Sequence, residues 1–427
     1  MMNTCGFGLA LLLCCALSAC VSIPPLSEST EPMSTVDTSW KKGKGFNLGE
    51  AKALIEFCTA LDYGQKEYVG NIPKPANAAG WEEVYPYHET LPANMDPNAI
   101  GPYDNAWKLY RKTNSDIYVI AIRGTIDTKG SIIDDVIATS ISANVHLPVD
   151  QTRFLSFKLA ETPQAETHLG WTYAMAELMF NADFGILKAL HAGLVPKGSR
   201  VLITGHSQGA AVATLVHAFL HYAISDPSDK FGLRDSGYTL KSYVFAQPKP
   251  GNWQFAMDFA RIAASRGTAF VINNNKDWVP QVPLSIEFVD EPGADLLVQL
   301  AKPPGLQGVV SSMLASGALG FATGSRAFIA LKVQEDTIKS ILQGHRLDDR
   351  YVEERGPGSI VPAYSVNYAV VGTQVPVFGS AAPAGAIPDD GSMSQHHGPT
   401  YRTLLELPEA LGGPPYNLDH PATYDGM

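Results

Sequence analysis

The sequence predicts an α/β fold, in which strands and helices alternate along the chain. Apolar stretches of strand length at 200–205 and 240–246 are each followed by a segment whose apolar residues have helical spacing. Such alternation is typical of a sheet covered by helices. The chain has 427 residues, of which 45% are hydrophobic and 17% are charged, so it can bury a substantial core around such a sheet.

The remaining elements follow from the periodicity of the apolar residues. Short apolar runs bounded by turn residues indicate strands, and longer runs with a spacing of three to four indicate helices. In chain order we expect a helix at 48–61, two strands within 105–125, a long helix at 171–194, the strand at 200–205 with its helix, a strand at 240–246, a helix at 252–265, a strand at 268–272 and a strand within 367–379.

The stretch 201–220 carries the most informative pattern, in which GHSQG (205–209) lies between an apolar strand and an Ala-rich helix. A Gly-x-Ser-x-Gly turn in this setting exposes its serine at the tip of a strand. A side chain at Gly205 or Gly209 would collide with the neighbouring strand or helix. The helix N-terminus points its free N–H groups at the reacting atoms. The pattern indicates Ser207 as a nucleophile, and the alternative is an ordinary strand–helix turn.

Several further motifs resemble, in order, those of the fungal-type (class 3) lipases, which belong to the α/β-hydrolase superfamily. An apolar strand ends in Arg-Gly-Thr (123–125), and His-Leu-Gly-Trp (168–171) resembles the family's His-x-Gly-Phe. FAQPKPGNWQF (245–255) resembles its Gly-x-Pro-x-x-Gly-Asn segment, and NNNKDWVP (273–280) resembles its polar turn followed by Asp-x-Val-Pro. The resemblance covers about 48–405 and implies an α/β-hydrolase fold, with a mainly parallel central sheet flanked by helices.

The resemblance also implies roles for single residues. In that family the residue after the Gly of the first motif helps to form the oxyanion hole, and the matching residue is Thr125. Its backbone N–H, with that of Gln208, is expected to stabilise a tetrahedral oxyanion. Asp277 matches the triad acid, whose carboxylate accepts from a His N–H and fixes its tautomer. A turn-capping aspartate is the alternative interpretation, and Asp258 and Asp290 are weaker candidates.

Four histidines lie downstream of the acid, as the Ser…Asp…His order requires, namely His345, His396, His397 and His420. NYAVVGTQVPVFG (367–379) resembles the strand that precedes the family's His, and in relatives that His often precedes a Tyr by five positions. His396 and Tyr401 match this spacing. We therefore predict His396 as the base, with His397 second and His345, which is one position out of register, third.

Two further segments each have two interpretations. Residues 127–167 correspond to a region that often holds a mobile lid in that family, and the apolar residues a lid helix would need are Ile132, Ile133, Val136 and Ile137. A packed surface helix is an equal alternative.

His168 is expected to be structural, because the family's His comes late in the chain. An insertion at about 285–362 contains an apolar run at 309–333, which we interpret as a buried helix pair, or else as a hairpin covering the active site or touching lipid.

The predicted function is that of a serine carboxylic-ester hydrolase of lipase type, acting on lipid esters such as acylglycerols. A phospholipase, a short-chain esterase and a non-catalytic envelope lipoprotein on the same fold are the alternatives. The mechanism needs no cofactor. The pair His396-His397 lacks the ligand spacing of a metal site, and no Gly-rich phosphate loop is present. A formal net charge of -11 argues against nucleic acid as a partner.

The N-terminus predicts targeting to a bacterial envelope. An apolar run ends in Leu-Ser-Ala-Cys20, which resembles a lipobox, although no Lys or Arg precedes it; a plain signal peptide or anchor is the alternative. Val21 favours the outer membrane by the same resemblance. After removal of the signal peptide, Cys58 would be the one cysteine that carries no lipid, and we expect it to be a core residue. The expected segments are a signal peptide at 1–19, a lipidated Cys20 with a flexible tether at 20–44, a hydrolase domain at 45–410 and a tail at 411–427.

Overall fold

The computed structural model describes residues 43–63, 80–84, 106–124, 140–149, 152–283, 347–354, 367–383, 385–387 and 393–411. The structural statements that follow concern these residues. Several expectations from the sequence lie outside them, namely Cys20, Thr125, the apolar residues Ile132, Ile133, Val136 and Ile137, Asp290, His345, His420, and nearly all of the N-terminal segments, the insertion and the tail.

A seven-stranded sheet forms the centre of the fold. The first two pairings are antiparallel, and each pairing from β3 to β14 is parallel. This order confirms the predicted α/β-hydrolase fold with its mainly parallel sheet. In sheet order the strands are β1 (Trp81–Glu83), β2 (Trp107–Lys112), β3 (Ile117–Ile122), β8 (Arg200–His206), β9 (Thr239–Phe245), β11 (Ala269–Asn274) and β14 (Thr373–Val377).

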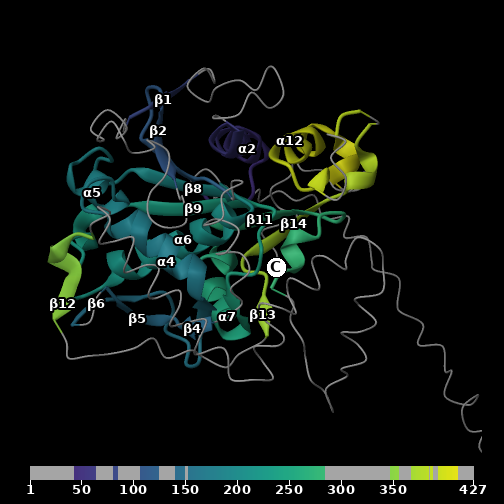
Figure 1. The fold of residues 1–427 in the computed structure, drawn as a ribbon. Helices are drawn as coiled ribbons and strands as arrows, with labels where there is room; N and C mark the ends of the chain where they lie inside the picture. Colours follow the sequence, from purple (N-terminus) through teal and green to yellow (C-terminus); the bar gives the residue numbers. More distant parts are fainter. Residues whose placement is uncertain are drawn as a thin grey trace, which may run out of the picture. The chain divides into compact units, whose positions relative to one another are not determined.

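Helices cover both faces of the sheet (Figure 1). One face packs against α2 (Leu48–Tyr63) and α12 (Gly398–Glu406), and the other against α4 (Leu169–Phe180), α6 (Gln208–Ser225) and α7 (Trp253–Ile262). Successive residues of a strand point to opposite faces. In β3, Ile120 belongs to the α4 and α6 side of the core and Val119 to the α2 and α12 side. Both faces of the strand are therefore apolar, as in other parallel sheets.

Side-chain caps set where several helices begin. The Asn47 carboxamide oxygen accepts from the Glu50 N–H at 2.9 Å at the start of α2, and Asn252 accepts from the Phe255 N–H at 3.0 Å at the start of α7. These caps satisfy N–H groups that have no partner inside the helix. The helices expected at 48–61 and 252–265 are confirmed within a few residues, and Cys58 lies fully buried on α2.

The prediction of one long helix at 171–194 is wrong, because the structure has two helices there, α4 and α5 (Ile186–His191). The side-chain oxygen of Asn181 accepts from the N–H groups of Asp183 and Phe184, both at 2.9 Å. Asparagine side chains compete in this way for main-chain groups that a helix would use. The apolar spacing continues across the break, which is why periodicity alone did not reveal it.

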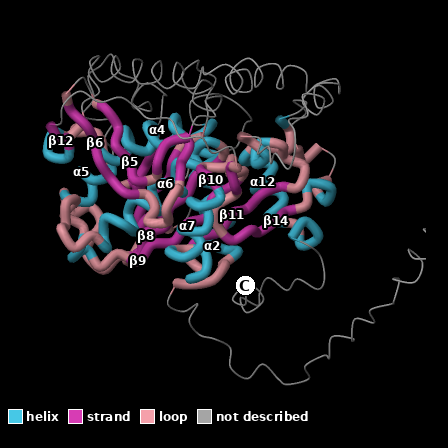
Figure 2. The backbone as a smooth tube through the Cα atoms, turned by 90° about the horizontal axis from the view of Figure 1, so that it is seen from below, coloured by secondary structure: helices cyan, strands magenta, loops and turns pink. Residues whose placement is uncertain are grey.

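Two small sheets lie on the α4 and α7 side of the central sheet (Figures 1 and 2). Part of the region 127–167 forms strands, at 140–142, 144–148, 153–158 and 166–168. The apolar residues expected to form a lid or surface helix in this region lie outside the described residues, so that prediction stays a prediction. The sheets are β13-β10-β7-β4 and β12-β6-β5, built from β4 (Ser140–Ser142), β5 (Asn144–Pro148), β6 (Arg153–Lys158), β7 (Glu166–His168), β10 (Gly251–Asn252), β12 (Val352–Glu354) and β13 (Tyr368–Ala369).

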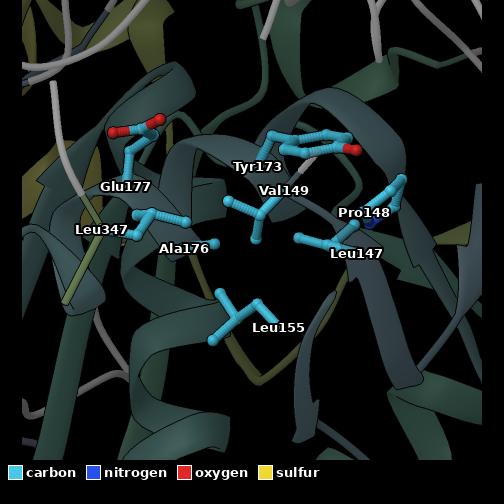
Figure 3. Close-up of a pocket in the computed structure, with 8 residues that line it drawn as sticks. All are labelled: Leu147, Pro148, Val149, Leu155, Tyr173, Ala176, Glu177 and Leu347. Carbon is cyan, nitrogen blue, oxygen red and sulfur yellow. The ribbon is translucent and has the colours of Figure 1, made fainter. Parts of the chain in front are cut away.

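Glu177 on α4 lies among apolar side chains beside one of these sheets (Figure 3). It is 1% exposed, and neither carboxylate oxygen has a hydrogen-bond partner in the part of the chain that the structure describes. Burial without compensating donors raises the pKa of Glu177 to about 8, so the carboxyl is protonated at neutral pH. Glu177 lines a small cavity beside this sheet. The other residues that line it are Leu147, Pro148, Val149, Leu155, Tyr173, Ala176 and Leu347.

Glu177→Gln is expected to stabilise the protein at alkaline pH. The folded pKa of about 8 exceeds the ordinary 4.5, so the stability from the neutral acid is fully present below pH 4.5 and is lost as pH rises through 8. In urea denaturation, the free energy of unfolding of the variant should exceed that of the parent by about 2 kcal/mol at pH 9 and differ little at pH 5. Glu354→Gln, at an exposed position, is the control; an equal difference at both pH values would contradict the prediction.

Candidate active site

Ser207 occupies a strained turn between β8 and α6. Its φ of 57° and ψ of -131° lie in a region that residues with a side chain rarely adopt. A Cβ at Gly205 would lie 2.1 Å from the Gly209 carbonyl oxygen, and a Cβ at Gly209 would lie 2.6 Å from that of Ile122 in β3. The predicted collisions at both glycines are thus confirmed. Glycine at both positions therefore allows β3, β8 and α6 to approach one another this closely.

Three side chains distant in sequence form one hydrogen-bonded chain at this turn. The Ser207 hydroxyl lies 2.8 Å from His396 Nε2, and His396 Nδ1 lies 2.9 Å from Asp277 Oδ2. Asp277 follows the C-terminal end of β11, and His396 lies in the turn before α12. All three are buried, with Ser207 the most exposed at 8%. The three residues predicted as nucleophile, acid and base are therefore brought together.

The partners of Asp277 fix the tautomer of His396. Asp277 accepts from the Tyr401 hydroxyl at 2.8 Å and from the Val279 N–H at 3.0 Å, so its carboxylate is supplied with donors. His396 Nδ1 donates to this carboxylate, which leaves Nε2 as the acceptor that faces Ser207. Burial lowers the pKa of His396, and the charges of His206 and His397 add to this against the opposing effect of Asp277. The neutral form of the His396 imidazole is thereby favoured.

The turn that carries His396 is attached to the end of β11 by Asn274. Its side-chain amide donates to the main-chain and side-chain oxygens of Gln395 at 2.9 and 2.8 Å. Its backbone N–H donates to the Tyr401 hydroxyl at 2.9 Å. Tyr401 is fully buried on α12 and also donates to Asp277. Asp277, the turn that carries His396 and α12 are therefore held together by hydrogen bonds.

A second Asp–His pair lies directly behind the first. His206 Nδ1 lies 3.0 Å from Asp62 Oδ2, and His206 Nε2 lies 2.7 Å from the backbone oxygen of His396. The other oxygen of Asp62 accepts from the Gly124 N–H at 2.8 Å. Sequence reasoning missed Asp62 altogether and gave His206 no role. The available signal was an acidic residue in the last turn of a helix, where the dipole disfavours it.

The predicted oxyanion-hole residues are described only in part. Gln208 is the first residue of α6, where a backbone N–H has no partner within the helix. Thr125 lies outside the described residues, but its predecessor Gly124 lies against the elbow: a Cβ at Gly124 would be 2.7 Å from the His206 carbonyl oxygen and 3.4 Å from Ser207 Cβ. The segment that follows β3 therefore borders Ser207.

The alternative candidates lie elsewhere or have other partners. Asp258 on α7 bonds Thr162, Tyr222 and Arg261 and takes no part in the triad. His397 is the N-cap residue of α12. His168 caps α4, accepting from the Trp171 N–H, and burial lowers its pKa to about 3. The structure thus gives His168 the structural position that was expected of it.

Among the described residues, no group of three or more His, Cys, Asp or Glu side chains could hold a metal ion. No helix in the same ranges is long and apolar enough to cross a membrane.

Comparison with known proteins identifies related sequences around this site. Residues 119–287 match the model of the family described as lipase (class 3). The secreted mono- and diacylglycerol lipase MDL4 of Malassezia globosa is 35% identical over 94 residues, which are 22% of this chain and 27% of that protein. The secreted mono- and diacylglycerol lipase LIP4 of Malassezia restricta is 37% identical over 83 residues, or 19% and 23% of the two chains. The chain thus spans about a quarter of the length of these curated relatives.

Solved structures of lipases are also similar to this chain. The M37 lipase has a TM-score of 0.42 at 17% identity, over 89% of this chain and 97% of that one. The Lip2 lipase from Yarrowia lipolytica has a TM-score of 0.38 at 18% identity, over 56% of this chain and 78% of that one. The sheet topology of the chain itself, together with the family match, defines the α/β-hydrolase fold.

Proposed function

We propose that this protein is a serine carboxylic-ester hydrolase of lipase type that acts on acylglycerols. The observation that carries the proposal is the hydrogen-bonded chain Asp277–His396–Ser207, with distances of 2.9 and 2.8 Å. The strained elbow presents the serine at the N-terminus of the 18-residue helix α6. This combination suits acyl transfer, because a nucleophile, a base and a helix N-terminus meet at one point.

The proposed reaction proceeds through an acyl-enzyme. Ser207 Oγ attacks the ester carbonyl carbon while His396 Nε2 takes the hydroxyl proton, and Asp277 stabilises the imidazolium that forms. Backbone N–H groups of Gln208 and Thr125 hold the oxyanion of the tetrahedral intermediate. The intermediate collapses, His396 returns the proton to the leaving alcohol, and Ser207 remains acylated. Water, activated by His396, then releases the carboxylic acid and restores the serine.

The proposed substrate class rests on the relatives. Both Malassezia proteins are named as mono- and diacylglycerol lipases, and the family match covers Ser207 and Asp277. Lipid esters are therefore the first substrates to test. A phospholipase and a short-chain esterase use the same chemistry, so the acyl-chain and head-group preference separates them.

Hydrolysis of a p-nitrophenyl ester series from acetate to palmitate tests the proposal. We expect the parent chain to be active, and Ser207→Ala and His396→Ala each to lower kcat by about 10⁴-fold or more, because each removes a member of the triad. His397→Ala is the matched control and should keep most of the activity. A fluorophosphonate should label the parent and not Ser207→Ala.

The outcomes separate the alternatives. Activity that survives His396→Ala and is lost in His397→Ala would move the base to His397. A folded parent that neither hydrolyses esters nor reacts with the fluorophosphonate would favour a non-catalytic envelope protein. A preference for acetate over palmitate would favour an esterase, and turnover of phospholipid vesicles would favour a phospholipase.

The acid limb of kcat/KM should have its midpoint below pH 6.5. His396 must be neutral to accept the serine proton, and its pKa in the folded chain is lowered from 6.5 by burial and by neighbouring charge. Activity should therefore rise with pH and persist into mildly acidic solution. His397→Gln removes one contributor to this shift, so its midpoint should move upward. A parent midpoint above 6.5 would contradict the assignment of His396.

We further propose that the chain is a bacterial lipoprotein, with a signal peptide at 1–19, lipid on Cys20, a tether at 20–44, a hydrolase domain at 45–410 and a tail at 411–427. The lipobox-like Leu-Ser-Ala-Cys20 supports this placement at the cell envelope. Expression in a bacterium with labelled palmitate should label the parent and not Cys20→Ser. Equal labelling of both would contradict the proposed anchor.

A further inference from the structure

Asp62 joins three parts of the candidate active site through a single carboxylate. One oxygen accepts from the Gly124 N–H at 2.8 Å, at the end of β3. The other lies 3.0 Å from His206 Nδ1, in the residue before the nucleophile. The far side of the His206 ring lies 2.7 Å from the backbone oxygen of His396. The side chains of His206 and Asp62 are only 4% and 9% exposed, so water competes little for these contacts.

The geometry determines where the protons of this pair lie. A carboxylate oxygen and a carbonyl oxygen face the two ring nitrogens of His206, and both are acceptors. Both contacts are hydrogen bonds when both ring nitrogens of His206 carry a proton. Burial lowers the pKa of His206, but Asp62, the His396 carbonyl and Asp277 outweigh burial, so that this pKa is raised.

The position of Asp62 is unfavourable for its own helix. It lies in the last turn of α2, where the negative end of the helix dipole disfavours an acid and no basic residue compensates. The buried face of α2 elsewhere carries apolar residues, among them Leu54, Phe57 and Leu61. A carboxylate here therefore serves its contacts with β3 and His206 rather than the helix.

We propose that Asp62 is a positioning residue of the hydrolase, which holds the oxyanion-hole strand at Gly124 and, through His206, the backbone of the base His396. The inference rests on the proposed function. Asp62 contacts no reacting atom. It sets the separation between the elements that carry the oxyanion donors, the nucleophile and the base, and a displacement of about 1 Å among such groups can cost about 100-fold in rate.

Substitutions of Asp62 separate its hydrogen bonds from its charge. In Asp62→Asn the amide oxygen can still accept from the Gly124 N–H, and the amide N–H can donate to His206 Nδ1 while Nε2–H still donates to the His396 carbonyl. Asp62→Ala removes both contacts. At pH 8, we expect kcat for the p-nitrophenyl ester to fall by about 30-fold or more in Asp62→Ala and by less than about 3-fold in Asp62→Asn, with KM nearly unchanged in both.

Asp258→Ala is the matched structural control. Asp258 is also a buried carboxylate with several donors, including Thr162 and Arg261, but it lies on α7 away from the triad. This variant should unfold at a lower temperature and keep kcat within about 2-fold, because the contacts it loses do not reach the reacting groups. Asp62→Ser, which is too short to reach His206, replaces Asp62→Ala if that variant does not fold.

Proton NMR of histidine side chains gives a readout that does not require turnover. The titratable groups facing His206 are Asp62 on α2, Asp277 after β11, and His396 and Tyr401 near α12. The Nδ1–H signal of His396, which reports its bond to Asp277, should shift or broaden in Asp62→Ala. It should persist in Asp62→Asn and Asp258→Ala.

Each outcome decides between the two proposals. A folded Asp62→Ala with parental kcat, or with an unchanged His396 signal, would overturn the positioning role. Loss of kcat in Asp62→Asn equal to that in Asp62→Ala would also overturn it, because charge and not hydrogen bonding would then be responsible. A parent without ester hydrolysis would remove the proposed function alone, and the His396 signal would still decide whether Asp62 positions the base.

Discussion

The close approach of β3, β8 and α6 around Ser207 is the constraint on which the site depends. The glycines at 205 and 209 leave no room for a Cβ, with gaps of 2.1 and 2.6 Å to backbone atoms. Ser207 itself remains at a positive φ, a conformation that costs of order 1–3 kcal/mol and persists only when the surroundings determine it. Those surroundings are fully buried apolar strands on both sides of the elbow, including Ile122 and Ile203.

The acid and the base reach this turn from distant parts of the chain. Asp277 and His396 are separated by 119 residues, and His396 and Ser207 by 189. The loops that carry them are held by polar contacts, chiefly those of Asn274 with Gln395 and with Tyr401. Buried hydrogen bonds of this kind are costly to leave unmade, so they select one arrangement of the loops. Precision at the site therefore comes from the loop network, and the sheet supplies the frame.

The parts of this arrangement that are local in sequence could be predicted from sequence. The elbow needs glycines at fixed positions, and the motifs around Asp277 and His396 each lie within a few residues of the side chain they mark. Six strands of the central sheet were expected from the sequence, but β1 (Trp81–Glu83), which has three residues, was not. The break at Asn181 was not predicted, because a single side chain overrides the helical spacing on either side of it. Asp62 could not be found either, since its partners Gly124 and His206 lie 62 and 144 residues away.

Two Asp–His pairs meet at the site, and what each imidazole faces on its other side decides its charge. His396 faces a hydroxyl, which can donate, so its Nε2 stays free to accept and the ring is neutral. His206 faces a carbonyl, which can only accept, and its pKa is raised, against the effect of burial, by its hydrogen bond to Asp62, so the doubly protonated ring is favoured. The two rings are 4.8 Å apart, and a proton held on His206 opposes another on His396. The second pair thus holds the base in place and also favours the protonation state that a base requires.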